Sequence, residues 1–342
     1  MITIHSEDYA LRNAKTELYG GELVAPFECA QRVRFVLDRV KTVKLGAVLP
    51  PDEFSIEPVL RVHAPPFVSF LENAWEEWTA AGYRGEAIAS CWPARRMTEI
   101  APAHIDGKLG YYAFAAETSI SAGTWRAARA AANVALTATR RVASGERAAF
   151  GLCRPPGHHA AKDLYGGYCF LNNAAISAQW LRDNGAARVA ILDVDFHHGN
   201  GTQDIFYERA DVLYASIHGD PREAFPYFLG YVDETGTGPG EGFNVNLPLP
   251  RGADFSVWRD ALAVALARIR AYGPDALVVS LGVDTFERDP ISFFRLASED
   301  FTTYGGLIGA VRLPTVFLLE GGYAVEEIGV NAVNVLSGFE QV

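Results

Sequence analysis

The spacing of hydrophobic and polar residues changes near residue 147. Beyond that point, short and nearly continuous apolar runs alternate with stretches whose apolar residues have a helical spacing. Continuous apolar runs are typical of parallel strands that are covered on both faces. We expect five such strands, at residues 148–153, 189–194, 212–217, 276–281 and 315–319.

Helical patterns lie between the predicted strands. The clearest covers about residues 256–272 and ends at Gly273-Pro274, a helix-stopping pair. Its apolar stripe contains Trp258, Leu262, Leu266 and Ile269. An Ala-rich helix is expected at about 124–144. Strands and helices in this order predict an α/β fold with an open, mostly parallel sheet and helices on both faces.

The first 120 residues have a weaker pattern. We expect a strand at 2–5 that joins the sheet, and helices at 31–39 and 68–81. Residues 82–118 are rich in Gly, Pro, Arg and aromatic residues. We interpret them as a loop-rich, structured insertion in a single domain that spans 1–342, because disordered segments carry fewer Trp and Tyr.

Composition and charge narrow the class of protein. Of the 342 residues, 49% are hydrophobic and 21% are charged, which is typical of a globular chain with a large core. The net charge of −11 argues against nucleic acid and anionic membranes as partners, and permits cationic substrates. We expect no signal peptide and no membrane span. Four cysteines without CxxC spacing favour free thiols and a cytoplasmic location.

Polar signatures follow each of the five predicted strands. Open α/β sheets bind ligands outside the carboxyl ends of their strands, so five clusters at one edge indicate a shared site. In chain order the clusters are Arg154 to His159, Asp193 to Gly201, Ser216 to Asp220, Gly282 to Thr285, and Glu320 to Tyr323.

The second cluster carries the most specific signal. Asp193, Asp195 and His197 alternate after an apolar run, and alternate residues of an extended chain point to one side. Two carboxylates and an imidazole beside a core need compensation, which a divalent cation usually supplies. The spacing therefore predicts a metal site. His198 would face the other way, and we expect it to be structural.

Taken singly, the other polar residues have simpler explanations. An Asp after a strand, such as Asp284, is often a helix cap or turn former. The pair His158-His159 can lie on the surface, and Tyr323 can be a buried ring with a satisfied hydroxyl. Only their arrival at one sheet edge favours a catalytic centre.

Together the motifs resemble a known family. The segments PPGHHA, GGYCFLNNAAI, DVDFHHGNGTQ, the Gly282-Val283-Asp284 turn with Asp289-Pro290 after it, and LEGGY occur in this order. They are similar to metal-dependent histone deacetylases and their bacterial relatives, the acetylpolyamine amidohydrolases, which share the arginase–deacetylase fold. HGNGTQ and LEGGY look closer to the class II branch. The N-terminal stretch HSEDYALRNAKTEL, with Pro26-Phe27-Glu28 after it, resembles the polyamine-deacetylase branch.

The resemblance implies one catalytic metal ion per chain. Its ligands would be Asp195, His197 and Asp284. The expected ion is Zn²⁺, with Fe²⁺ or Co²⁺ as substitutes. Three protein ligands leave a coordination position open, which is typical of a catalytic zinc site.

The resemblance also implies the roles of the catalytic side chains. His159 would be the general base, His158 would stabilise the transition state, and Tyr323 would donate its hydroxyl to the acyl oxygen. Asp193 would orient His158, and Asn200 would orient His159. Because Asn is uncharged, it would raise the pKa of His159 less than Asp does.

Further residues match the family's substrate tunnel and its sites for structural K⁺ or Na⁺. The tunnel and rim residues would be Gly167, Tyr168, Phe225, Ile291 and Glu117. One cation site would use Asp193, Asp195, His197, Ser216 and Ile217. The other would use Phe206, Arg209, Val212 and Phe243.

The leading hypothesis is a zinc-dependent amidohydrolase that removes acetyl groups from polyamines and related aliphatic amines. Its substrate would be a small cationic amine, and the enzyme would be a homodimer. The N-terminal match, the acidic charge and the 82–118 insertion, which is long enough to narrow the entrance or form a dimer contact, favour it. The main alternative is a deacetylase of acetyl-lysine in proteins or peptides.

Two other hypotheses are less favoured. An arginase-type manganese ureohydrolase needs a second metal and therefore more Asp and His ligands. A non-catalytic acyl-chain binding module would have lost a ligand, a His or Tyr323, whereas this chain keeps all six positions.

Overall fold

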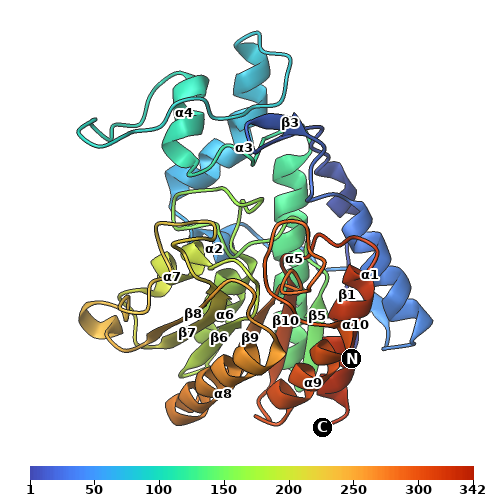
Figure 1. Ribbon diagram of the computed structural model, residues 1–342. Coiled ribbons are helices and arrows are strands. Elements are labelled where there is room, and N and C mark those ends of the chain that lie inside the picture. Colours follow the sequence, from blue (N-terminus) through green and yellow to red (C-terminus); the bar gives the residue numbers. More distant parts are fainter.

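The computed structural model describes residues 1–342, which are built around one eight-stranded sheet (Figure 1). The strands of this sheet are β1 (Ile2–Ile4), β4 (Val48–Leu49), β5 (Ala148–Gly151), β6 (Val189–Asp193), β7 (Val212–Gly219), β8 (Asn244–Leu249), β9 (Ala276–Leu281) and β10 (Thr315–Leu319). A separate antiparallel hairpin consists of β2 (Glu17–Tyr19) and β3 (Glu22–Val24). The helices are α1 (Gln31–Thr42), α2 (Glu57–Leu60), α3 (Pro65–Ala80), α4 (Ile105–Tyr112), α5 (Thr124–Ala143), α6 (Asn173–Asp183), α7 (Asn200–Phe206), α8 (Phe255–Tyr272), α9 (Ser298–Gly309) and α10 (Ile328–Glu340).

The strands follow the order β4-β1-β5-β10-β9-β6-β7-β8, and every neighbouring pair is parallel. The predicted α/β fold with a parallel sheet is confirmed. The five strands predicted from apolar runs are present within two residues of their expected ends. The pattern missed β8, because this edge strand has the polar sequence NVNLPL and contains a proline.

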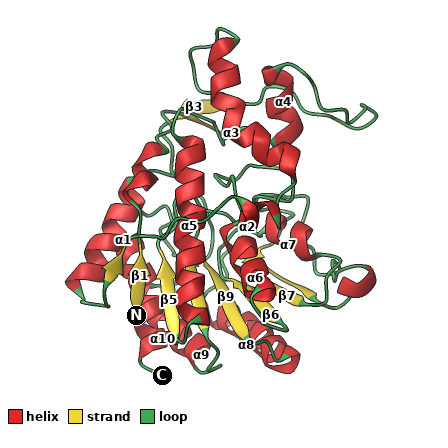
Figure 2. Cartoon of the chain, turned by 180° about the vertical axis from the view of Figure 1, so that it is seen from behind, coloured by secondary structure: helices red, strands yellow, loops and turns green.

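The sheet separates two hydrophobic cores. Along β6, Val189 and Ile191 belong to one core, whereas Ala190 and Leu192 belong to the other. This alternation follows from the two-residue period of a strand. Helices α8, α9 and α10 cover one face in Figure 1, and α5 and α6 cover the opposite face in Figure 2. Burial on both faces explains why the central strands are continuously apolar.

Helix α8 shows how local signals set the ends of an element. The Asp254 side chain accepts hydrogen bonds from the backbone N–H groups of Ser256 and Val257, which caps the start of the helix. Gly273 ends it with a left-handed backbone at φ 64°. The predicted span of 256–272 therefore differs from the observed one by a single residue.

No bounds were predicted for helices α9 and α10, whose helical pattern is weakened by the glycines that let them pack. A Cβ on Gly305 would lie 2.1 Å from the Val335 carbonyl oxygen, and one on Gly338 would lie 2.0 Å from that of Thr302. Only glycine permits so close an approach of the two backbones. Glycine also has a low helix propensity, which hides the helical pattern in the sequence.

The 82–118 insertion consists of loops and α4, which packs on α3. In Figure 1 these two helices project beyond the layers of the sheet domain. The Lys108 ammonium and the Glu77 carboxylate join the helices through an ion pair of 2.6 Å. A role of this insertion in narrowing the entrance or in dimer contact stays a prediction. None of the helices is both long and apolar enough for a membrane crossing.

The buried His63 predicts a loss of stability at acid pH. Its Nδ1 lies 2.9 Å from the Ala161 carbonyl oxygen, and its Nε2 accepts the backbone N–H of Asn172 at 2.9 Å. Burial lowers the pKa of His63 to about 4, from 6.5. Below pH 6.5 the unfolded chain therefore binds more protons than the native chain. The free energy of unfolding consequently decreases as the pH is lowered. As the pH is lowered from 6.5 to 4, we expect the different protonation of His63 in the two states to decrease the free energy of unfolding by about 3 kcal/mol.

Urea unfolding at a series of pH values measures this effect. His63→Gln removes the titrating group and is expected to flatten the pH dependence relative to the parent chain. The exposed His104 provides the control, because His104→Gln should keep the parent slope. An unchanged slope in His63→Gln would contradict the assignment.

Candidate active site

The candidate site lies where four adjacent strands end. Strands β5, β10, β9 and β6 are neighbours in the sheet and all run in the same direction. Their carboxyl ends therefore meet at one edge, which is where open α/β sheets bind ligands. The loops after these strands carry His158 and His159 (β5), Asp195 and His197 (β6), Asp284 (β9) and Tyr323 (β10).

Three of these side chains form a group of possible metal donors. One donor atom from each of Asp195, His197 and Asp284 lies within 4.8 Å of the others, and all three residues are buried. The Nδ1 atom of His197 is 2.9 Å from Asp284 Oδ2 and 3.3 Å from Asp195 Oδ1. Ligands about 2.0–2.1 Å from a tetrahedral zinc ion lie about 3.3 Å apart. The donor types and their spacing fit a divalent cation.

Electrostatics also favours a cation among these donors. Burial, together with the charge of Asp195, raises the pKa of Asp284 to about 8. Although burial opposes it, hydrogen bonds and charge from both carboxylates raise the pKa of His197 to about 10. Two carboxylates this close therefore require a positive charge between them, and a metal ion can supply it in place of a proton.

The prediction that Asp193, Asp195 and His197 converge because they share one face of an extended strand is wrong. Strand β6 ends at Asp193, so Asp195 and His197 lie in the loop that follows and share no strand face with Asp193. The loop is bent by its own side chains, because Asp193 Oδ1 accepts the Asp195 N–H and Asp195 Oδ1 accepts the His197 N–H. These turns bring Asp195 and His197 together and leave Asp193 turned toward His158.

His158 is paired with a buried carboxylate. Its Nδ1 atom lies 3.1 Å from Asp193 Oδ2, which also accepts the Tyr214 hydroxyl at 3.1 Å. Although burial opposes it, the charges of Asp195 and Asp193 raise the pKa of His158 to about 10. The hydrogen bond to the Asp193 carboxylate therefore favours the protonated, positively charged form of this imidazole.

His159 is paired with a neutral amide instead. Its Nδ1 atom lies 2.7 Å from Asn200 Oδ1, and its ring centroid is 4.0 Å from that of His158. Burial lowers the pKa of His159, and the nearby charges of His158 and His197 lower it further. The two adjacent rings consequently differ in protonation at neutral pH, with His159 neutral.

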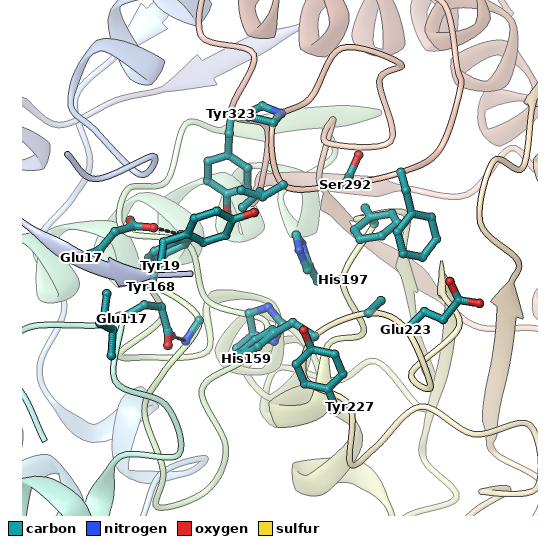
Figure 3. A pocket seen from close by; sticks show the side chains of 18 of the residues that line it. Glu17, Tyr19, Glu117, His159, Tyr168, His197, Glu223, Tyr227, Ser292 and Tyr323 are labelled. Carbon is teal, nitrogen blue, oxygen red and sulfur yellow. Dashed lines mark hydrogen bonds between the residues drawn. The ribbon is translucent and has the colours of Figure 1, made fainter. Parts of the chain in front are cut away.

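A cavity of about 500 Å³ opens onto these groups. Figure 3 shows His159, His197 and Tyr323 around its inner part. The predicted tunnel residues all line the cavity: Gly167, Tyr168, Phe225, Ile291 and Glu117. The ring of Phe225 lies 5.2 Å from that of His159, and Tyr168 lies 5.6 Å from Tyr323. Flat apolar walls of this kind suit a methylene chain.

Gly167 brings the backbone close to a catalytic-site ring. Its φ is +56°, and a Cβ there would lie 2.3 Å from His159 Cδ2. Any other residue would displace the His159 ring or the loop. The predicted backbone approach of Gly167 thus has a steric reason.

Acidic side chains line the cavity up to its mouth, where Glu223 is exposed and Glu117 is half-buried, whereas Glu17 is buried. Figure 3 shows Glu17 and Glu117 on one side and Glu223 on the other. Glu117 Oε1 accepts the Gly167 N–H at 2.7 Å and the Thr118 hydroxyl at 2.9 Å. Glu17 Oε1 accepts the Tyr168 hydroxyl at 3.0 Å. Glu17 was not among the predicted site residues, although it lies within the N-terminal stretch HSEDYALRNAKTEL.

The residues predicted for monovalent cations lie beside β6 and β7. Asp193 and Ser216 face each other across these strands in register. The second group surrounds the start of β7 and comprises Phe206, Arg209, Val212 and Phe243. His198 stays outside the cavity, with its ring 4.6 Å from that of His218. Ion binding at either group stays a prediction.

Comparison with known proteins gives one consistent result. Residues 26–339 match the histone deacetylase domain. The chain is 58% identical to acetylpolyamine amidohydrolase 2 of Pseudomonas aeruginosa, over 100% of this chain and 99% of the relative. It is 57% identical to the acetylpolyamine amidohydrolase of Mycoplana ramosa, over 99% of both chains.

The chain belongs to the histone deacetylase family. Its fold matches the crystal structure of an acetylpolyamine aminohydrolase from Burkholderia pseudomallei with a TM-score of 0.95 and 41% identity, over 99% of this chain and 98% of that one. The family and fold predicted from the motifs are therefore confirmed. The prediction of an acetylpolyamine amidohydrolase agrees with the names of all three relatives.

Proposed function

We propose that the protein is a metal-dependent amidohydrolase that removes acetyl groups from acetylated polyamines. The observation that carries the proposal is the buried Asp195–His197–Asp284 group, whose His197 lines a cavity with carboxylates at its mouth. An acetyl group fits beside the donors, an aliphatic chain fits between the rings, and a distant ammonium fits the acidic mouth. The names of the relatives support the same substrate class.

In the proposed mechanism, the two histidines and the tyrosine have different roles in proton transfer and charge stabilisation. Asp195, His197 and Asp284 would hold a divalent cation, which would supply Lewis acidity toward the acyl oxygen and the attacking water. Neutral His159 takes the proton of that water as general base. Charged His158, held by Asp193, stabilises the developing negative charge and delivers a proton to the leaving amine.

Tyr323 completes the oxyanion site. Its ring lines the cavity, and its hydroxyl donates to the acyl oxygen as negative charge develops there. Burial raises the pKa of Tyr323 well above its usual range, so the hydroxyl keeps its proton for donation. A hydrogen-bond donor that is already oriented toward the developing charge needs no costly reorganisation during the reaction.

The proposal extends to the ions, the assembly and the location. Zn²⁺ is the proposed catalytic ion, since one imidazole and two carboxylates are a common zinc donor set. K⁺ or Na⁺ would occupy the groups beside β6 and β7, where hard oxygen ligands are available. The enzyme would act as a cytoplasmic homodimer. Four free cysteines, two of them buried, suit a reducing compartment.

A comparison of three substrates tests the proposed substrate class. We expect kcat/KM for N-acetylputrescine to exceed that for an acetyl-lysine peptide, and that for neutral N-butylacetamide, by about tenfold or more. The physical reason is a charge-assisted hydrogen bond between the substrate ammonium and the mouth, which contributes about 1.5–3 kcal/mol. A preference for the peptide would contradict the polyamine assignment.

Variants at the mouth show whether its charge is responsible. Glu117→Gln keeps the acceptor for the Gly167 N–H but removes the charge, so we expect KM for N-acetylputrescine to rise several-fold while N-butylacetamide is unaffected. Glu223→Gln is the comparison variant, because the Glu223 carboxylate is paired with Arg251 at 2.9 Å and is expected to contribute less to binding of the substrate ammonium. Equal effects of Glu117→Gln on both substrates would exclude charge recognition by Glu117.

A further inference from the structure

The peptide group that precedes Tyr323 is held at both of its polar atoms. The Arg32 guanidinium donates from Nε to the Gly322 carbonyl oxygen at 2.7 Å. The Tyr323 N–H donates to Asp289 Oδ2, also at 2.7 Å. Arg32 is fully buried, and only 8% of Asp289 is exposed. A buried cation and a buried anion thus hold the two ends of one peptide dipole, and we call this pair of side chains the Arg32–Asp289 clamp.

The cationic side of this clamp is itself well supported. Besides the Gly322 carbonyl, the Arg32 guanidinium donates to the Glu320 carbonyl, and it lies 4.9 Å from the centre of the Tyr323 ring. Its charge is compensated by Glu28, whose Oε1 lies 3.0 Å from Arg32 Nη1. Arg32 therefore contacts both the backbone and the ring of the tyrosine, and it comes from α1, far away in the sequence.

Asp289 supplies the anionic side. Its Oδ2 accepts a second N–H, from Ala324 at 3.3 Å, and its Oδ1 accepts the Ile291 N–H at 3.1 Å. One buried carboxylate therefore joins the loop of Tyr323 to the loop of Ile291, a residue of the cavity wall. Asp289 is absent from the cavity lining, so it is placed to act on the site through these backbones.

The segment before Tyr323 needs such external support. Gly322 has a φ of +129°, a conformation that side-chain-bearing residues rarely adopt, and it follows another glycine. A glycine pair leaves the backbone many alternative conformations. An oxyanion donor must nevertheless be aimed to within a fraction of an ångström, because a shift of about 1 Å can reduce the rate by about 10²-fold.

We infer that Asp289 is a positioning residue for the Tyr323 hydroxyl, acting together with Arg32 on the Gly322–Tyr323 peptide. The inference rests on the proposed function, in which Tyr323 donates to the acyl oxygen. Asp289 contributes nothing to the reaction itself. Its effect on the rate is transmitted through Tyr323 and disappears when the tyrosine hydroxyl is removed.

A double-mutant cycle tests this dependence. Asp289→Asn replaces an acceptor with a group that cannot satisfy all three N–H donors, and we expect kcat for N-acetylputrescine to fall about 10- to 100-fold. In the Tyr323→Phe background, which alone loses about 10²–10³-fold, the same change is expected to lower kcat less than twofold. Equal losses in both backgrounds would overturn the inference.

Controls separate positioning from general damage. Asp254→Asn also alters a carboxylate that accepts two backbone N–H groups, but it caps α8 away from the cavity and should leave kcat unchanged. Metal content and thermal unfolding are measured for every variant. If Asp289→Asn does not fold, Arg32→Lys is put through the same cycle, because it weakens the other side of the clamp.

The inference and the proposed function fail in different ways. Full turnover in Tyr323→Phe alone would remove the oxyanion role of the tyrosine and therefore contradict the proposed mechanism. Impaired turnover in Tyr323→Phe, with an undiminished effect of the clamp variant in that background, would leave the mechanism intact and contradict only the role of Asp289.

Discussion

Asp284→Asn is expected to lower turnover of N-acetylputrescine by at least about 10³-fold and to leave the purified protein with little bound zinc. The substitution removes one of two anionic donors, while the amide oxygen can still accept the Phe196 N–H that Asp284 Oδ1 accepts at 2.8 Å. The fold should therefore persist while the metal is lost. Elemental analysis and steady-state kinetics on the same preparation measure both effects.

Thermal unfolding gives a readout of this site that does not depend on activity. A metal ion that binds only the native chain stabilises it by mass action, so added Zn²⁺ should raise the Tm of the chelator-treated parent protein. The same addition should not raise the Tm of Asp284→Asn. Asp254→Asn, at the start of α8, should respond like the parent. A zinc response in Asp284→Asn equal to that of the parent would exclude Asp284 as a ligand.

His159→Ala is expected to lower kcat by about 10²–10⁴-fold, the usual contribution of a general base. The reason is the neutral state of His159, whose pKa is lowered by burial and by the positive charge of His158. Zinc content should stay that of the parent protein, because His159 is not among the three grouped donors. Retention of more than about a tenth of the parent kcat would contradict the base assignment.

A variant of its partner tests the same assignment through pH. A general base must be deprotonated to act, so activity falls as pH drops through its pKa. Asn200→Asp places a negative charge at the atom now 2.7 Å from His159 Nδ1, and this charge favours the protonated ring. The acid limb of the kcat profile should therefore move to higher pH. A limb that stays in place, or moves to lower pH, would contradict the base role of His159.

The strands that support the site were predictable because their signal is local. β9 and β10 match their expected bounds, since a strand buried on both faces must be apolar at every position. α9 and α10 were not predictable, because the glycines that allow their contact weaken the helical pattern. The signal of a helix is lost where its packing requires residues that disfavour helices.

The candidate site was predictable in its membership and less so in its geometry. Asp195 and His197 were assigned by motif, but the strand ends at Asp193, and hydrogen bonds within the following loop bring the donors together. Asp289 was noted only as part of a motif. Its contact with Tyr323 joins residues 34 positions apart, and nothing in the local pattern encodes such a contact.

The class of fold, the family and the residues available for chemistry follow from the sequence alone, because apolar runs and motifs are properties of neighbouring residues. The hydrogen-bond partners and protonation states of these residues depend instead on the tertiary structure. Folding brings Asp193 to His158 and Asn200 to His159, and the carboxylates beside His158 favour its protonated form, whereas burial and the neighbouring charge keep His159 neutral. The packing of α1 against α10 and the loop after β9 bring Arg32 and Asp289 to the two ends of one peptide group. The charge of the histidines and the orientation of Tyr323 depend on distances between segments that are remote in sequence. These distances are set only when the chain folds.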